Sequence, residues 1–140
     1  MKGINWVGVV AALVVGQALG FLWYAVVFEE QWMALMGLTA ADMEGSEASM
    51  GLGAVNQLIV AIGLGWAVAA TGNNSFAGGA KVGLFAAVFF ALTTEAQRFI
   101  YGGADQGLIP IDGGYLLLAY VLMGAVAGGV KMPARTAVAG

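Results

Sequence analysis

The 140-residue chain contains no cysteine, no histidine and few charged residues. Without cysteine it can form no disulfide, thiolate metal site or thiol nucleophile, and its redox compartment cannot be inferred. Without histidine it lacks the commonest general base and the commonest metal ligand. Its net charge of −3 offers no basic patch for nucleic acid. These absences remove much of the usual enzyme chemistry, so we predict a protein that is not an enzyme and needs no cofactor or metal.

The chain instead contains long runs of apolar residues. Hydrophobic residues make up 61% of it and charged residues only 9%, against about 25% charged in an ordinary soluble domain. Four apolar runs approach or exceed the roughly 20 residues that cross a bilayer, and the first is longer than the core of a signal peptide, about 7–15 residues. The sequence predicts an all-α integral membrane protein, a single domain (1–140) forming a four-helix bundle. The predicted spans are 4–28, 50–70, 76–101 and 112–130.

An acidic segment, EEQWMALMGLTAADMEGSEAS, separates the first two runs and holds five of the eight acids. Trp32 and Met36 fall at helical spacing, which predicts a short helix lying in the membrane interface and ended by Gly37. Thr39, followed three residues later by Asp42, resembles a capping box and predicts a second short helix. An irregular acidic loop is the alternative.

The last run has an ambiguous beginning. Its apolar register extends back to Ile109, but Pro110 and Asp112 favour a start near residue 112, with Asp112 as the N-cap. At the other end, Lys131 suits the negative end of the helix dipole.

The basic residues predict the orientation of the chain. Four of the five fall at the N-terminus, in the turn between the second and third runs, and at the C-terminus, whereas the other two loops carry almost all the acids. The positive-inside rule then places both termini in the cytoplasm, in a bacterial cytoplasmic (inner) membrane. The four are Lys2, Lys81, Lys131 and Arg135.

Polar residues inside apolar spans need partners, so each is a candidate site residue. Those of the first three spans can converge on one pocket that opens outward and has Gln17 as its floor. Arg98 lies 17 residues, or roughly 25 Å, beyond Lys81 and should reach the outer interface. The alternative is simple hydrogen bonding between helices, with Glu95 and Arg98 forming an i,i+3 surface pair. The candidate pocket residues are Gln17, Asn56, Gln57, Thr94, Glu95 and Arg98.

Small residues and aromatic residues follow two further patterns. Glycines spaced four apart allow close helix packing, within one protomer or between protomers. Trp23, Tyr24 and Trp32 gather at the outer end of the first span, where an aromatic belt anchors the chain at headgroup depth. A lipid or pigment pocket could use the same rings, although no histidine is present to ligate a chlorin or haem. The predicted packing glycines are Gly16, Gly20, Gly124 and Gly128.

Several short motifs are similar to those of one family. In the first half these motifs are Asn5-Trp6, Gly20, Leu22-Trp23-Tyr24, Phe28, Trp32 and Met36-Gly37-Leu38; in the last helix the match is IDGGYLLLAYVLMGAVAGG. Together they resemble the DUF1761 family of small membrane proteins, whose function is uncharacterised. Where the family has serine–proline and glycine, this chain has Ala25-Val26 and Glu29, so its first helix should leave the membrane with less of a kink. The resemblance implies four helices and no catalytic residue.

These features favour a non-enzymatic protein that works by association. It would be an accessory or structural subunit of a larger membrane complex, or a homo-oligomer packed through glycine faces. The expected partners are the lipid bilayer and other membrane subunits or further copies of the chain, and a bound lipid stays open as a ligand. The alternative is a small oligomeric transporter or channel that uses the polar pocket. A lipid-modifying enzyme would have to rely on Glu95 and Tyr101.

Overall fold

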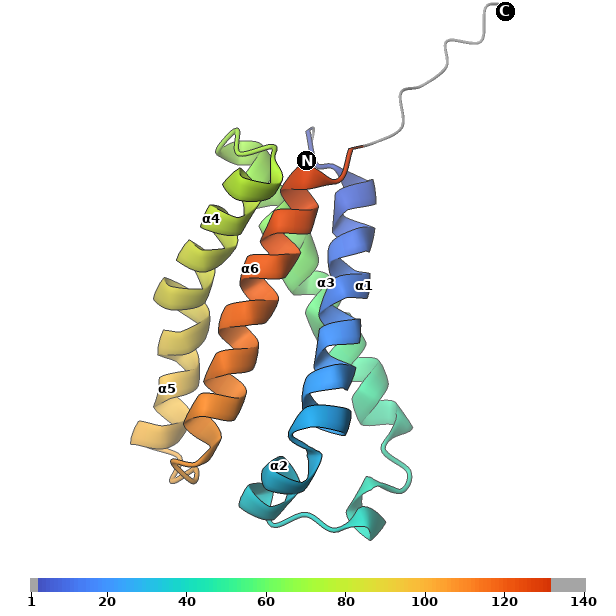
Figure 1. Cartoon of the computed structure of the whole chain (residues 1–140), viewed down its shortest axis with the longest axis vertical. Coiled ribbons are helices and arrows are strands. Elements are labelled where there is room, and N and C mark those ends of the chain that lie inside the picture. Colours follow the sequence, from blue (N-terminus) through green and yellow to red (C-terminus); the bar gives the residue numbers. More distant parts are fainter. Residues whose placement is uncertain (1–2, 132–140) are drawn as a thin grey trace, which may run out of the picture.

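The computed structural model describes residues 3–131, which are helical and contain no strand. Four helices in this part of the chain are long and apolar enough to cross a membrane, and they run side by side as a bundle (Figure 1). Their bounds are Trp6–Val27, Glu47–Ala70, Phe76–Ile100 and Ile109–Gly129. The all-helical prediction is therefore confirmed for this part of the chain, and the four long apolar helices have bounds close to those of the predicted spans.

Three of the long helices change locally from α to π geometry, which the sequence did not predict. The first is α1 (Trp6–Leu22) followed by a π-turn, and the third joins α4 (Phe76–Ala86) to α5 (Leu92–Ile100) through another. The fourth begins with a π-turn and continues as α6 (Gly114–Gly129), whereas α3 (Glu47–Ala70) is α-helical throughout. The π-turns are Trp23–Val27, Ala87–Ala91 and Ile109–Gly113.

The acidic segment folds into two short helices rather than an irregular loop. The first, α2 (Glu29–Met36), ends at Gly37, whose φ of 66° is the left-handed conformation that glycine adopts readily. The Asp42 carboxylate accepts from the Thr39 backbone N–H (2.7 Å) and hydroxyl (2.6 Å), and a 3₁₀ turn, Ala40–Met43, follows. These hydrogen bonds hold the pKa of Asp42 below its usual value. The predicted helix stop and the capping box are both present.

The prediction that Asp112 caps the fourth helix is wrong. This helix begins at Ile109, and Asp112 lies inside its first, π-helical turn. Pro110 does not delay the start. The backbone N–H groups of the first helical turn have no acceptor within the helix, so the absence of an N–H on proline breaks no hydrogen bond there. Asp112 thereby turns its side chain inward, toward other helices.

The last helix, α6, lies at the centre of the packing and contacts α1, α3 and α4 (Figure 1). Its closest partner is α4, and the contact is made through glycine backbones. A Cβ on Gly124 would clash with Gly79 and crowd the Gly83 backbone, and one on Gly128 would lie 2.5 Å from the Ser75 carbonyl oxygen. Glycine at these positions lets the two helices approach to backbone contact.

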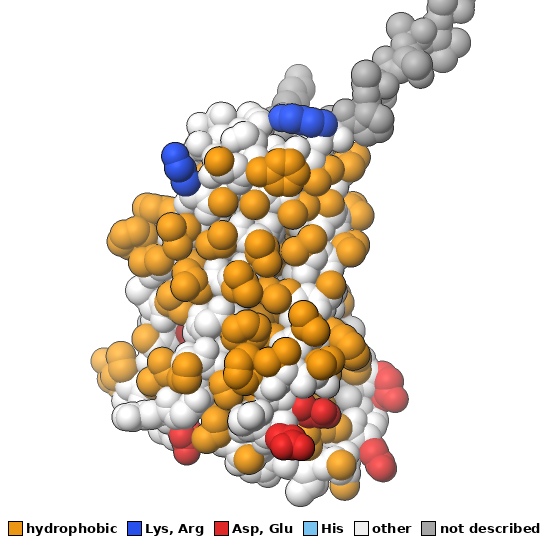
Figure 2. Space-filling model, viewed as in Figure 1, with side chains coloured by type: hydrophobic (Ala, Val, Ile, Leu, Met, Phe, Trp, Pro, Cys, Tyr) orange, Lys and Arg blue, Asp and Glu red, His pale blue; other side chains and the backbone are white. Residues whose placement is uncertain are grey.

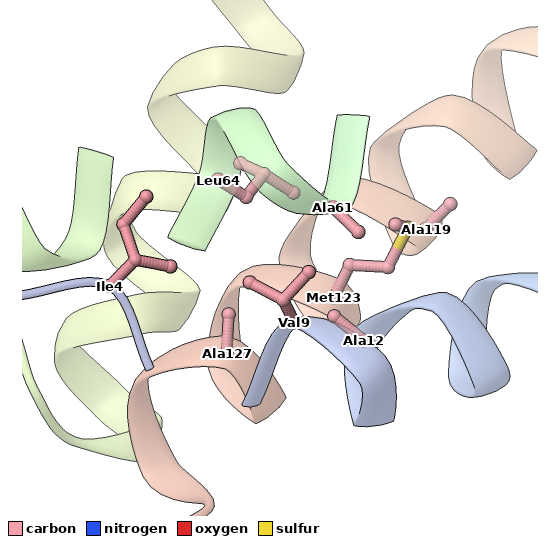
Figure 3. Packing of buried hydrophobic residues seen from close by; sticks show 8 residues of the cluster. All are labelled: Ile4, Val9, Ala12, Ala61, Leu64, Ala119, Met123 and Ala127. Atoms are coloured by element: carbon pink, nitrogen blue, oxygen red, sulfur yellow. The ribbon is translucent and has the colours of Figure 1, made fainter. Parts of the chain in front are cut away.

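The buried apolar side chains form a layer between α1, α3 and α6 (Figure 3). Val9, Leu64 and Met123 are its larger members, and alanines fill the positions where the helices are closest. The cluster comprises Ile4, Val9, Ala12, Ala61, Leu64, Ala119, Met123 and Ala127. This layer occupies the half of the bundle away from the acidic segment, since it includes Ile4 at the entry to α1.

The outer surface is apolar along the bundle and charged at its ends. Figure 2 shows hydrophobic side chains along the length of the visible face, with basic groups at one end and acidic groups at the other. Lys131 donates to the Asn74 carbonyl oxygen (2.9 Å), so it lies beside the turn that leads into the helix of Lys81. Lys2 and Arg135, which also entered the orientation prediction, lie outside the described residues.

Candidate functional site

Asp112 is the centre of an ionic cluster at the acidic end of the bundle. It is 6% exposed, and among the described residues it is the buried charged side chain. The Tyr24 hydroxyl donates to its Oδ1 (2.8 Å), and Arg98 donates to its Oδ2 (3.3 Å). A carboxylate inside an apolar bundle needs such donors, since an unpaired buried charge is strongly destabilising.

Arg98 links Asp112 to a second carboxylate, that of Glu95 one turn earlier on α5. The i,i+3 pair is therefore present, but it belongs to a larger cluster. The Arg98 side chain is 45% exposed and that of Glu95 is 18% exposed. Solvent reaches the pair, so its contribution to stability stays within about 0–1 kcal/mol.

Two of the three π-turns position this cluster. Each carries one member of the Tyr24–Asp112 hydrogen bond, and a π-turn adds a residue that changes the direction of the side chains around it. The same two turns are joined a second time, because Trp23 Nε1 donates to the Ile111 carbonyl oxygen (2.9 Å). The exit of the first span is thus fixed against the entry of the fourth.

A second polar group lies nearer the middle of the long helices and joins three of them, with Gln17 exposed and Gln57 partly buried. Gln17 Nε2 donates to Gln57 Oε1 (2.8 Å), and Gln57 Nε2 donates to the Tyr115 hydroxyl (2.9 Å). Gly16 leaves room for this chain, because a Cβ there would clash with the Gln57 side chain. Gly20 likewise leaves room for the Tyr115 hydroxyl, 3.3 Å from where its Cβ would be. These two glycines therefore accommodate side chains rather than a neighbouring backbone.

The predicted pocket residues fall into two groups instead of one. Gln17 and Gln57 belong to the second polar group, and Glu95 and Arg98 belong to the ionic cluster. The rings of Tyr24 and Tyr115, with centroids 5.1 Å apart, connect the groups.

The two other predicted pocket residues take no part in either group of hydrogen bonds described above. Asn56 lines a cavity of about 140 Å³ beside Gln57. Thr94 is exposed and lines neither this cavity nor the larger one beside the ionic cluster. Tyr101, considered as a catalytic residue, is 85% exposed and also lies outside both cavities.

A cavity of about 620 Å³ lies beside the ionic cluster and is bordered by α2, α3, α5 and the start of the fourth helix. Its lining combines three kinds of side chain. Aromatic rings come from Tyr24, Trp32 and Tyr115, methionines from positions 33, 36 and 43, and ionic groups from Glu29, Glu95, Arg98 and Asp112. The volume falls within the range of about 300–1,000 Å³ that is usual for small-molecule sites.

The predicted interface anchors also contact protein. Trp23 packs beside Phe28, with ring centroids 4.8 Å apart, and Trp32 meets Tyr24 edge to face at 5.4 Å. Tyr24 is therefore in contact with both Trp32 and Tyr115, and the three rings form a continuous aromatic wall along the cavity.

Sequence reasoning missed three roles in the site: Asp112 as a bound carboxylate, Tyr24 as its hydrogen-bond donor, and Tyr115 as the acceptor of a hydrogen bond from Gln57. An acid within reach of an apolar helix was the available signal for Asp112. Within residues 3–131, no group of three or more acids, histidines or cysteines is placed to hold a metal ion. The groups that line the cavity can offer a ligand ionic, hydrogen-bonding and aromatic contacts.

One comparison with known proteins gave a match. The family model described as "Protein of unknown function (DUF1761)" covers residues 7–128, which is most of the chain and agrees with the motifs noted in the sequence. No curated protein and no solved structure matches the chain.

Proposed function

The chain belongs to the DUF1761 family, and we propose that it is a non-enzymatic subunit that associates with other membrane proteins. Its setting is a bacterial cytoplasmic membrane, with both termini in the cytoplasm and α2 in the outer interface. Four apolar helices support the membrane setting. Lys81 and Lys131 at one end, with the acidic segment at the other, support the orientation.

The observation that carries this proposal is the bare outer end of α3. Every residue from 47 to 53 is exposed, so no other helix packs over these two turns, although Ser49 and Gly53 border the larger cavity. Met50 is 68% exposed and Leu52 is 71% exposed. A Cβ added at Gly51 or Gly53 would meet nothing within 4 Å. Small residues on an uncovered helix provide the kind of surface on which a second transmembrane helix packs closely.

The inner glycines do not serve the same purpose. Gly124 and Gly128 are already covered by α4 within the protomer, so they cannot also form an interface between protomers. Association through the outer end of α3 therefore replaces a glycine-packed oligomer built on α6. The partner is another membrane subunit or a second copy that contributes an apolar helix.

Gly51→Leu tests this proposal, with Gly63→Leu as the matched control. Both glycines lie on α3 and both have open space around them, but only Gly51 lies in the uncovered end. We expect the protein extracted gently from its native membrane to run as an assembly larger than the 14.2 kDa chain. Gly51→Leu should remove the larger species and Gly63→Leu should keep it, by native mass spectrometry. A wild-type protein that runs as a single chain contradicts the proposal.

The second candidate, a small transporter, is favoured by the position of the cavities. The larger cavity adjoins the smaller one, with Gly53, Tyr115 and Leu116 lining both, and a polar surface thereby extends inward to Asn56 and Gln57. Within one protomer this surface ends at Met123, which is 1% exposed and belongs to the apolar layer. Conduction would then require a larger movement or a path between protomers.

Glu95→Gln separates the two candidates in a proton- or cation-flux assay in proteoliposomes. We expect no change in flux, because Glu95 is partly solvated and paired to Arg98. Glu44→Gln, an exposed acid outside the cavity, is the control. Flux that is present in the wild type and disappears only with Glu95→Gln would establish the transporter and overturn the accessory subunit.

A further inference from the structure

The larger cavity has a net negative lining. Three carboxylates and one guanidinium border it, which gives a formal charge of −2. Arg98 binds both Glu95 and Asp112, so its charge is already compensated inside the cluster. Glu29 at the rim has no such compensation from the lining. An anionic headgroup entering here would meet carboxylates, whereas a cation would be attracted.

The charge of the surroundings has the same sign. The acidic segment that borders the cavity carries Glu30, Asp42, Glu44 and Glu47 in addition to Glu29, and no basic residue. The lysines at positions 81 and 131 lie at the other end of the bundle. A concave apolar site with an excess of one sign of charge concentrates ligands of the opposite sign.

The aromatic wall adds a second preference for positive charge. Tyr24 stands edge to face with Trp32 at 67° and with Tyr115 at 63°, so neighbouring rings present differently directed faces. The face of a tryptophan or tyrosine ring attracts an organic cation, most strongly where water is excluded. Rings from three separate elements therefore border a space that also has excess carboxylate.

The remaining lining explains which kind of cation fits. Met33, Met36 and Met43 supply flexible, polarisable side chains that adapt to an apolar body. A calcium or magnesium ion takes about six or more oxygen ligands, and two of the carboxylates here are already bound to Arg98. A bulky apolar cation uses the rings, the methionines and the charge together.

We propose that this cavity is a binding site for a lipophilic organic cation, a quaternary ammonium or phosphonium group on an apolar body. The ligand reaches the site from the outer leaflet, since the cavity lies at the acidic end of the bundle. Its charge faces the carboxylates and the aromatic wall, and its apolar body contacts the methionines of α2. The site lies within one chain, so it goes beyond the proposed association and does not depend on it.

Tetraphenylphosphonium and tetraphenylborate provide a matched pair of probes, similar in shape and opposite in charge. Binding is measured by titration calorimetry on the purified chain in nanodiscs of zwitterionic lipid, and the signal of each ion with empty nanodiscs of the same lipid is subtracted, because the membrane dipole potential alone favours the borate. We expect the protein to bind the phosphonium at least tenfold more tightly than the borate. Equal protein-dependent binding of the two ions, or tighter binding of the borate, overturns the proposal because the cavity then does not select positive charge.

Two variants locate the site. Trp32→Leu keeps an apolar side chain on α2 and removes a ring, so phosphonium affinity should fall about fivefold. Glu29→Gln removes an exposed charge at the rim and should weaken binding about threefold. The matched control is Glu44→Gln, an exposed acid of the same segment outside the cavity, which should bind as the wild type does. Phosphonium affinity that is unchanged in Trp32→Leu overturns the site.

The proposed cation site and the proposed association can be tested independently of each other. Gly51 lies outside the cavity lining, so Gly51→Leu should break the assembly and leave phosphonium binding unchanged. Thermal unfolding is measured to check that Trp32→Leu is folded, and we expect that it is because Trp32 belongs to α2, outside the buried layer.

Discussion

At the scale of single residues, the outer end of the bundle depends on how Asp112 is held. Its two oxygens receive hydrogen bonds from different helices, one from Tyr24 and one from Arg98. The three residues belong to the first, third and fourth spans, so one carboxylate connects three of the four. A hydrogen bond to a charged group is worth about 1.5–3 kcal/mol, which makes these contacts important in a small protein.

Tyr24→Phe should therefore destabilise the fold by about 1–2 kcal/mol, because it removes a donor from a buried carboxylate and keeps the ring. Tyr101→Phe is the matched control, since Tyr101 is 85% exposed. Unfolding of the purified variants in mixed detergent micelles measures the difference. Equal stability of the two variants would show that Asp112 gains little from the tyrosine.

Local pairs could be predicted from the sequence at this scale, and distant pairs could not. Glu95 and Arg98 are three residues apart on one helix, so their contact follows from helix geometry. Asp112 and Tyr24 are 88 residues apart. Their contact requires two spans to pack and two π-turns to direct the side chains, and no local pattern of residues records a π-turn.

At the scale of elements, the lengths of the apolar runs were sufficient to predict the four long helices. A run of about 20 apolar residues can be recognised in the sequence without knowledge of the tertiary structure. The ends were less certain. Pro110 and Asp112 suggested a later start for the fourth helix, although proline in a first turn is compatible with an earlier one. Glycine spacing pointed to close contacts, but only the structure shows that Gly124 meets α4 while Gly16 meets a side chain.

Gly128→Leu should disrupt the bundle, because a side chain there would collide with the backbone of the turn before α4 and with Gly79. The expected effect exceeds about 3 kcal/mol or prevents folding, since a helix backbone has to move. Gly63→Leu should be tolerated, as nothing lies within 4 Å of that position. Yield, monodispersity and melting temperature measure both variants. A Gly128→Leu protein that melts as the wild type does would contradict the packing.

At the scale of the whole molecule, the two ends of the bundle differ in charge, and this difference sets the expected orientation. Glu44 and Asn74 are exposed residues at opposite ends, in the acidic segment and in the turn between α3 and α4. Because the chain has no cysteine, Glu44→Cys and Asn74→Cys each introduce one unique label.

An impermeant thiol reagent added to intact cells from the periplasm should label Glu44→Cys and spare Asn74→Cys. Permeabilised cells, in which both positions should react, provide the control. The reverse pattern would place the termini outside and move the cavity to the cytoplasmic side.

The central position of α6 has a consequence for how the protein is made. Residues are synthesised from the N-terminus, so the helix that contacts α1, α3 and α4 emerges last. Until then α4 lacks the backbone that covers Gly79 and Gly83, and Trp23, in the π-turn after α1, lacks the Ile111 carbonyl to which it donates. We therefore expect the first three long helices to be joined only through the contacts of α3 with α1 and α4 until α6 is made, and the finished bundle to form when synthesis of the chain is almost complete.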